Sequence, residues 1–150
     1  MGPGQRLATL TAADVERIRA ATGRAEASFV EREHFTPGEV ADYVDVRPLY
    51  AGYFHEPVRL YLRATGGACV FLDRAAGCTL AADSRPAACL LYPFDLDAAG
   101  RVTVQDPDGC RAARGCGSVS ELVGAFSTSR RQLVRLGRRV ADEARAHGRR

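Results

Sequence analysis

The chain has 150 residues, a formal net charge of +3 at pH 7 and 46% hydrophobic residues. This length suits one domain whose hydrophobic core needs no cross-link to fold. All 21 basic residues are arginines, so the absence of lysine excludes a Schiff-base nucleophile and a P-loop lysine.

The N-terminal third of the chain is predicted to be helical. Thr11 to Thr22 has a capping residue, an apolar stripe and a terminating Gly23. Further helices are expected over Ala25 to Glu33 and from Thr36 to about Val44. The next segment, Arg47 to Glu56, is an aromatic loop of the kind that often covers a small core.

The central part of the chain is predicted to contain short strands and turns. Val58 to Arg63 alternates like a half-buried strand, and Gly66 and Gly67 then turn the chain. Arg85 and Pro86 are expected to open a helical turn that carries Cys89. A further strand is expected over Arg101 to Gln105.

The C-terminal part is predicted to be helical from Ser118 onward, with Ser118 and Glu121 as a capping box and a bend at Ser127 to Ser129. We expect residues 118–147 to pack on the domain through a buried stripe of Leu122, Val123, Phe126, Leu133, Leu136 and Val140. Residues 130–150 hold eight arginines, which can form a solvated helix face or a surface for nucleic acid or an acidic partner. We favour the solvated face, and therefore expect no nucleic-acid partner.

Taken together, these elements predict one compact domain over residues 1–150, mainly α-helical with a few short β-strands, which is a small α+β fold. No stretch approaches the roughly 20 apolar residues that cross a bilayer. The N-terminus has no basic and then apolar secretion pattern either. We therefore expect a soluble, cytoplasmic protein with no membrane partner.

All five cysteines lie in one third of the chain, with the pattern C-x8-C-x10-C-x20-C-x5-C: Cys69, Cys78, Cys89, Cys110 and Cys116. Thiols are kept reduced in the cytoplasm, and an odd number leaves one cysteine outside any set of disulfides. Four converging thiolates can hold a zinc ion or ligate an iron-sulfur cluster. Spacing alone favours a metal site, while free or redox thiols and disulfides remain open alternatives.

The segments GACVFLD, GC and SRPAACLLYPF, with the later GC at Cys110, resemble the YkgJ-like proteins, a group described as zinc- or iron-chelating domains. Cys69, Cys78, Cys89 and Cys110 fall on the cysteine positions of that group. The resemblance covers roughly Leu7 to Gly117, and RPxxCxxYPF is its most specific part. It implies a metal centre, either an iron-sulfur cluster or zinc, in proteins whose reaction is usually unassigned.

The chain departs from the pattern of that group in several places. Its members usually carry further cysteines before the first helix, where this chain has MGPGQR, so either the given start omits a piece or one set of ligands has been lost. LAADS is one residue longer than the usual segment after Cys78, and Leu90 stands where arginine is common. Cys116 has no clear counterpart, so it can substitute for a lost ligand or be a bystander.

The prediction for function is therefore a metal-binding protein, with an iron-sulfur cluster on Cys69, Cys78, Cys89 and Cys110 and with Arg85 near the sulfurs to spread their negative charge. Arg85 can instead pair with Asp83 or cap a turn. A structural four-cysteine zinc module is the first alternative. A protein-modifying enzyme, similar to the lysine methylases among the relatives, or a thiol redox enzyme is the second. A metal or cluster and a further protein are the expected partners.

Overall fold

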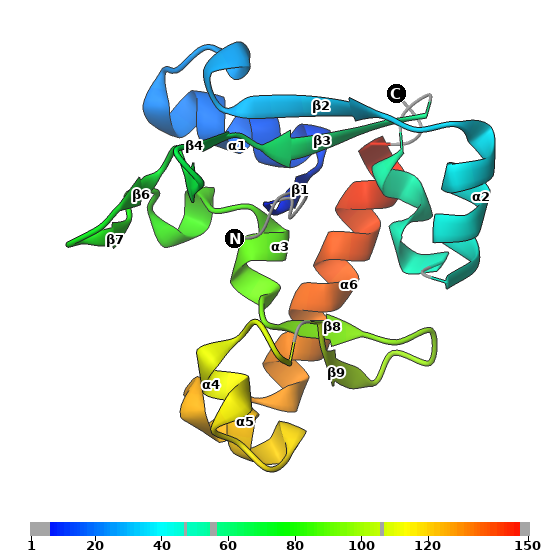
Figure 1. Cartoon of the computed structure of the whole chain (residues 1–150), viewed down its shortest axis with the longest axis vertical. Coiled ribbons are helices and arrows are strands. Elements are labelled where there is room, and N and C mark those ends of the chain that lie inside the picture. Colours follow the sequence, from blue (N-terminus) through cyan, green and yellow to red (C-terminus); the bar gives the residue numbers. More distant parts are fainter. Residues whose placement is uncertain (1–6, 47, 55–56, 106, 148–150) are drawn as a thin grey trace.

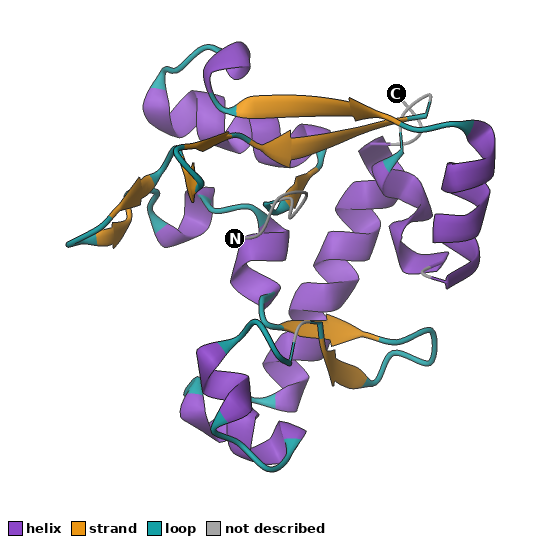
Figure 2. Ribbon diagram, viewed as in Figure 1, coloured by secondary structure: helices purple, strands orange, loops and turns teal. Residues whose placement is uncertain are grey.

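The structure is a computed structural model that describes residues 7–46, 48–54, 57–105 and 107–147. It confirms the predicted class, because the chain forms a small α+β domain. The long helix α6 (Arg130–His147) runs through the middle of the molecule, as Figure 1 shows, with helices and short strands arranged around it. Figure 2 shows that the strands form several small groups instead of one large sheet.

The largest sheet has three antiparallel strands in the order β1 (Thr9–Leu10), β3 (Val58–Leu62) and β2 (Val30–His34). Helix α1 (Ala12–Thr22) begins with the predicted capping box and ends at Gly23 in the left-handed conformation. Strand β3 was expected to be half-buried, but Arg59 and Tyr61 are also buried, so both of its faces are covered.

The prediction of a helix over Ala25 to Glu33 is wrong. The chain instead makes a short 3₁₀ turn at Glu26–Ser28 and then forms β2, which pairs along its whole length with β3. Pairing with a strand almost thirty residues away determines that this segment is extended. Local sequence patterns do not reveal such a partner. The prediction for the next helix is confirmed: α2 (Pro37–Val46) follows Thr36, whose N–H donates to Glu39 Oε2 at 2.7 Å.

The aromatic loop partly forms a 3₁₀ helix, Pro48–Tyr53, and Tyr53 and Phe54 are buried as expected for a core lid. Two hairpins follow β3: β4 (Ala64–Thr65) pairs with β5 (Ala68–Cys69), and β6 (Leu72–Asp73) pairs with β7 (Gly77–Cys78). A 3₁₀ turn at Ala82–Ser84 leads into α3 (Ala87–Leu91), the predicted helical turn with Cys89. Strands β8 (Phe94–Leu96) and β9 (Val102–Val104) form the next hairpin.

The C-terminal part contains α4 (Arg111–Arg114), α5 (Val119–Ala125) and α6. The chain bends between α5 and α6 as predicted, and Ser127 has a φ of 50°. Phe126 was expected in the buried stripe but is 42% exposed, because α5 ends at Ala125 and leaves its ring at the edge of the core, packed on Phe94. No helix in the described ranges is both long and apolar enough to cross a membrane.

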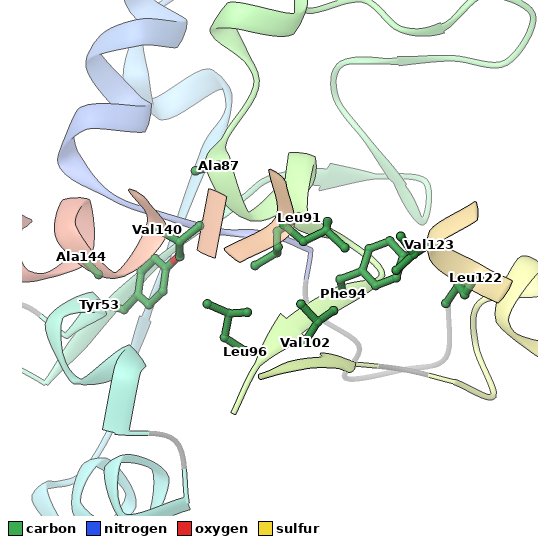
Figure 3. Close-up of a cluster of buried hydrophobic side chains, with 11 residues drawn as sticks. Tyr53, Ala87, Leu91, Phe94, Leu96, Val102, Leu122, Val123, Val140 and Ala144 are labelled. Carbon is green, nitrogen blue, oxygen red and sulfur yellow. The ribbon is translucent and has the colours of Figure 1, made fainter. Parts of the chain in front are cut away.

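The buried side chains form two clusters. The first, here called the α6 core and drawn in Figure 3, joins α3, β8, β9, α5 and α6. The second, here called the sheet core, lies between α1 and the three-stranded sheet and includes Phe71 and Leu80. Two glycines let the chain approach α6 and its surroundings closely: a Cβ on Gly52 would lie 2.4 Å from the Ala144 carbonyl, and one on Gly137 would lie 2.3 Å from Leu96.

A buried polar network joins the two clusters. Asp14, at the start of α1, accepts hydrogen bonds from Thr11 and from the backbone N–H of Ala87 in α3 at 3.1 Å. Arg17 pairs with Asp14 and also with Glu143 of α6, 2.8 Å away. The two ends of the described chain are therefore tied together through one arginine.

Candidate metal centre

Three of the five cysteines lie near one another. Cys69 ends β5, Cys78 ends β7 and Cys89 lies in α3. The thiols are close enough for a charge on one to affect the pKa of another. In each case a buried apolar residue follows two positions later, and these three anchors are Phe71, Leu80 and Leu91. The anchors fix the backbone on which the thiols are presented.

Cys69 is partly buried against the sheet core. Burial raises the pKa of its thiol, and the charge of Cys78 raises it further. The backbone N–H of Phe71 donates to Cys69 Sγ at 3.5 Å and acts in the opposite direction, because it stabilises the thiolate. An N–H bond to sulfur is also the kind of contact that surrounds thiolates bound to a metal.

Cys89 is the most strongly affected thiol. Burial, followed by the charges of Cys69, Asp14 and Cys78, raises the pKa of Cys89 to about 12. The positive charge of Arg85 acts in the opposite direction and lowers it, although its effect is the smallest. Without a further positive charge, Cys89 therefore remains a protonated thiol at neutral pH.

Cys78 is the exposed member of the set and lies opposite Leu72 in a hairpin of two-residue strands. Gly77 has a φ of 83°, in the left-handed region, and Asp73 Oδ1 accepts hydrogen bonds from two backbone N–H groups in the turn. Backbone geometry and one carboxylate thus hold the turn. The hairpin buries little surface, since residues 72 to 76 are exposed.

Arg85 was expected near the sulfurs. Its Nε donates to the carbonyl oxygen of Leu80 at 3.0 Å, and this bond connects the segment after Cys78 to the start of α3. The charge of its guanidinium group reaches Cys89. The structure gives Asp83 a different partner, the hydroxyl of Ser84 at 3.1 Å. Arg85 therefore holds the turn before α3 and acts electrostatically on the Cys89 thiol, not on that of Cys69.

Cys110 and Cys116 lie in another part of the fold. Cys110 is buried at the start of α4, and Cys116 packs against the α6 core. Neither of them is among the groups that shift the pKa of Cys69 or Cys89. In Figure 1, α4 lies at the lower end of the molecule and the β6–β7 hairpin projects from its left side. The structure thus brings together three of the predicted ligands and separates the other two from them.

The arrangement is not a closed coordination site. All five cysteines are free thiols, and within the described ranges no three His, Cys, Asp or Glu side chains are grouped so that they could hold a metal ion. Binding of a metal by Cys69, Cys78 and Cys89 therefore requires the thiols to move closer. The β6–β7 hairpin is the element best able to move, because residues 72 to 76 are exposed and make few contacts that would hold it in place.

The structure also adds a neighbour that the sequence does not reveal. Asp14 is 1% exposed, and its charge contributes to the raised pKa of Cys89. In the sequence Asp14 is recognisable only as part of a helix cap, 75 positions before Cys89. The hydrogen bond from Ala87 to Asp14 shows how α1 and α3 come into contact.

Comparison of the chain with protein-family models, with curated proteins and with solved structures gives no match. The resemblance to the YkgJ-like proteins therefore stays a prediction that depends on the cysteine segments themselves.

Proposed function

We propose that the chain is a metal-binding protein that holds an iron-sulfur cluster, as the resemblance to the YkgJ-like proteins implies. Of the four cysteines on which that resemblance rests, we propose Cys69, Cys78 and Cys89 as ligands and leave Cys110 as the one to be tested. The observation that carries this proposal is that the thiols of three separate short elements come near enough for a charge on one to affect the pKa of another. Free cysteines that only fill a core need no such convergence, because each can pack wherever space allows.

The electrostatics of the site support a cationic occupant. Burial and the neighbouring thiols raise the pKa values of Cys69 and Cys89, so these two thiols resist becoming thiolates. A bound metal removes this obstacle, since its positive charge favours deprotonated sulfur. Arg85 supplies part of the same effect from the protein side.

The local fold supports the same proposal. The β4–β5 and β6–β7 hairpins have strands of two residues each, and a lone two-stranded hairpin is marginally stable in water. A metal bound by one thiol from β5, one from β7 and one from α3 would cross-link these elements. When bound, an iron-sulfur cluster supplies one-electron transfer chemistry, and three protein ligands leave a fourth position for another group.

Zinc is the second candidate, because three thiolates and one further ligand also suit its tetrahedral preference. A thiol redox catalyst is less well supported. Such enzymes need a cysteine with a lowered pKa, whereas burial raises the pKa of both Cys69 and Cys89.

The test is the metal and acid-labile sulfide content, with a visible spectrum, of protein purified without oxygen. Iron with sulfide and a broad visible absorption band is the expected result. Zinc at about one per chain with no colour would replace the cluster by a structural zinc site. Protein with neither metal, prepared with both metals supplied, would contradict the proposal.

Single cysteine variants assign the ligands. Cys69→Ser, Cys78→Ser and Cys89→Ser should each lose most of the bound metal, while the matched control Cys116→Ser should keep it. Cys110→Ser tests the fourth ligand predicted from the sequence. Loss of metal in that variant would mean that the β9–α4 segment contributes to the site, and retention would limit the protein ligands to the three gathered thiols.

A further inference from the structure

A groove lined by arginine runs along one side of α6. It has a volume of about 600 Å³ and is lined by Arg130, Arg131, Val134, Arg135, Arg138, Arg139 and Asp142. A second hollow of about 510 Å³ continues it over the β8–β9 hairpin and shares Arg130 and Val134 with it. Figure 1 shows that hairpin beside the lower half of α6. The two hollows form one surface, here called the arginine groove.

Three of these arginines have no ion pair with any residue in the described ranges: Arg131, Arg135 and Arg138. All three are exposed. The two others are held by neighbours, since Arg130 donates to Ser120 Oγ at 2.9 Å and Arg139 donates to Glu143 at 2.9 Å. Arg101, in the second hollow, donates to Asp97 at 2.7 Å. The groove thus combines three positioned arginines with three that are available to an incoming anion.

The floor of the groove is apolar. Val134 is shared by both hollows, and Val102 and Val119 line the part over the hairpin. All three pack against or belong to the α6 core, so their positions are fixed from below. An apolar floor beneath a rim of arginines suits a ligand that presents carboxylates together with an apolar side chain.

We propose that the arginine groove binds a short acidic segment of another protein, with carboxylates on Arg131, Arg135 and Arg138 and an apolar side chain on Val134. The planar guanidinium group matches a carboxylate with two parallel hydrogen bonds. The distance along the helix from Arg131 to Arg138 is about 10 Å, which about three extended residues span. This proposal is independent of the metal centre, because no cysteine lines the groove.

The lining favours a protein segment over a nucleic acid. Proteins that bind single strands stack bases on aromatic side chains, and neither hollow has an aromatic residue in its described lining. Asp97 and Asp142 also line the groove, where they pair with Arg101 and Arg145 and interrupt the row of free positive charge that a continuous row of phosphates would follow. A peptide can place its carboxylates individually and avoid those two positions.

Fluorescence anisotropy can test this with a labelled peptide in which every third residue is leucine and the others are aspartate or glutamate. The triple variant Arg131→Gln, Arg135→Gln, Arg138→Gln should bind this peptide about tenfold more weakly than the wild type, because each exposed pair contributes modestly. The matched control is Arg74→Gln, Arg111→Gln, Arg114→Gln, which removes the same charge from exposed positions elsewhere and should bind as the wild type does. Equal losses in both triple variants would overturn the proposal.

Two further comparisons separate a peptide site from a general anion site. Val134→Thr keeps the shape of the side chain but makes it less apolar, so it should weaken binding of the leucine peptide and leave a peptide with serine in place of leucine unaffected. A DNA oligonucleotide should compete poorly. If the oligonucleotide displaced the peptide at lower concentrations than the unlabelled peptide itself, the groove would be a nucleic-acid surface. Absence of any peptide binding at low salt would also overturn the proposal.

Discussion

The α6 core and the region around the three gathered cysteines are built in different ways. In the α6 core, helices and the β8–β9 hairpin bury large side chains, and Gly52 and Gly137 allow backbone to approach α6 and its neighbours closely. Around the cysteines, the two hairpins have two-residue strands, and residues 72 to 76 are exposed. Side-chain packing holds the α6 core together. The cysteine region is held by a few buried anchor residues, next to its thiols.

This difference indicates what each region needs in order to stay folded. Side-chain burial stabilises the α6 core whether or not a ligand is present. The two hairpins of the cysteine region have strands of two residues each, and such hairpins are marginally stable alone, so a metal that links β5, β7 and α3 would add a constraint. Measurements of thiol reactivity and of the free energy of unfolding can show whether the two regions differ in this way.

The largest expected effect is a difference in reactivity between two thiols of the metal-free protein. Burial first, and then neighbouring charges, raise the pKa of Cys89 from 9.0 to about 12. Each unit lowers the thiolate population tenfold, so at pH 8 Cys89 should react with iodoacetamide about a thousandfold more slowly than an ordinary thiol. The exposed Cys78 should react quickly, and mass spectrometry of the alkylated peptides measures both. Similar rates for the two thiols in folded protein would show that Cys89 is not buried as described.

The next largest effect should come from Gly52→Ala. A Cβ at this position would lie 2.4 Å from the backbone of Ala144, which cannot move without shifting α6. We expect the free energy of unfolding to fall by about 3 kcal/mol. The control is Gly124→Ala in α5, where nothing lies within 4 Å of the added Cβ. That variant should be more stable by about 0.8 kcal/mol, because alanine favours a helix over glycine. Denaturant unfolding measures both, and equal effects would contradict the tight contact.

A smaller effect is expected from Asp14→Asn, which alters the polar network between the sheet core and the α6 core. The amide would place an N–H₂ group among donors that now share the carboxylate of Asp14: Thr11, Ala87 and Arg17. We expect a loss of about 2 kcal/mol in the free energy of unfolding. The exposed Asp42→Asn in α2 should change it by less than about 0.5 kcal/mol. If the two variants proved equally stable, Asp14 would not link the sheet core to the α6 core.

The smallest effect concerns pH and Glu143. Burial raises the pKa of Glu143, but hydrogen bonds from Arg17 and Arg139 outweigh it, and the pKa lies below the ordinary value of 4.5. Because the pKa is lowered in the folded state, the stabilisation is present above pH 4.5 and is lost as the pH falls through the lower folded value. Solvent screens this partly exposed group, so we expect at most about 1 kcal/mol.

Glu143→Gln should therefore flatten the decline in stability between neutral and acidic pH, as measured by urea unfolding at several pH values. If the free energy of unfolding changed with pH in the same way in the wild type and the variant, Glu143 would not be the group responsible for the loss of stability in acid.

Local signals in the sequence predicted several elements correctly. Thr11, Asp14 and Gly23 mark the two ends of α1, and Thr36 with Glu39 marks the start of α2. These features depend on hydrogen bonds within a few residues, so the sequence alone reveals them. Strand β2 was missed because its regular structure depends on pairing with β3, and the nearby charges in Glu31 to His34 resemble an exposed helix face.

The cysteines show the same distinction at the candidate site. Their clustering along the chain is visible in the sequence, but it cannot show which of them meet. Cys110 and Cys116 follow the β8–β9 hairpin, which leads the chain toward the lower end of α6, away from the β6–β7 hairpin (Figure 1). Cys69, Cys78 and Cys89 precede that hairpin, and their thiols are near enough to affect one another's pKa.

Amide hydrogen exchange, with and without the metal, tests the central difference between the two regions most directly. The protein would be purified without oxygen and compared with the same sample after chelation. We predict that residues 64–80 exchange slowly only in the metal-bound sample, while α6 is equally protected in both. Identical exchange of residues 64–80 in the two samples would contradict the proposal that a metal organises the cysteine region.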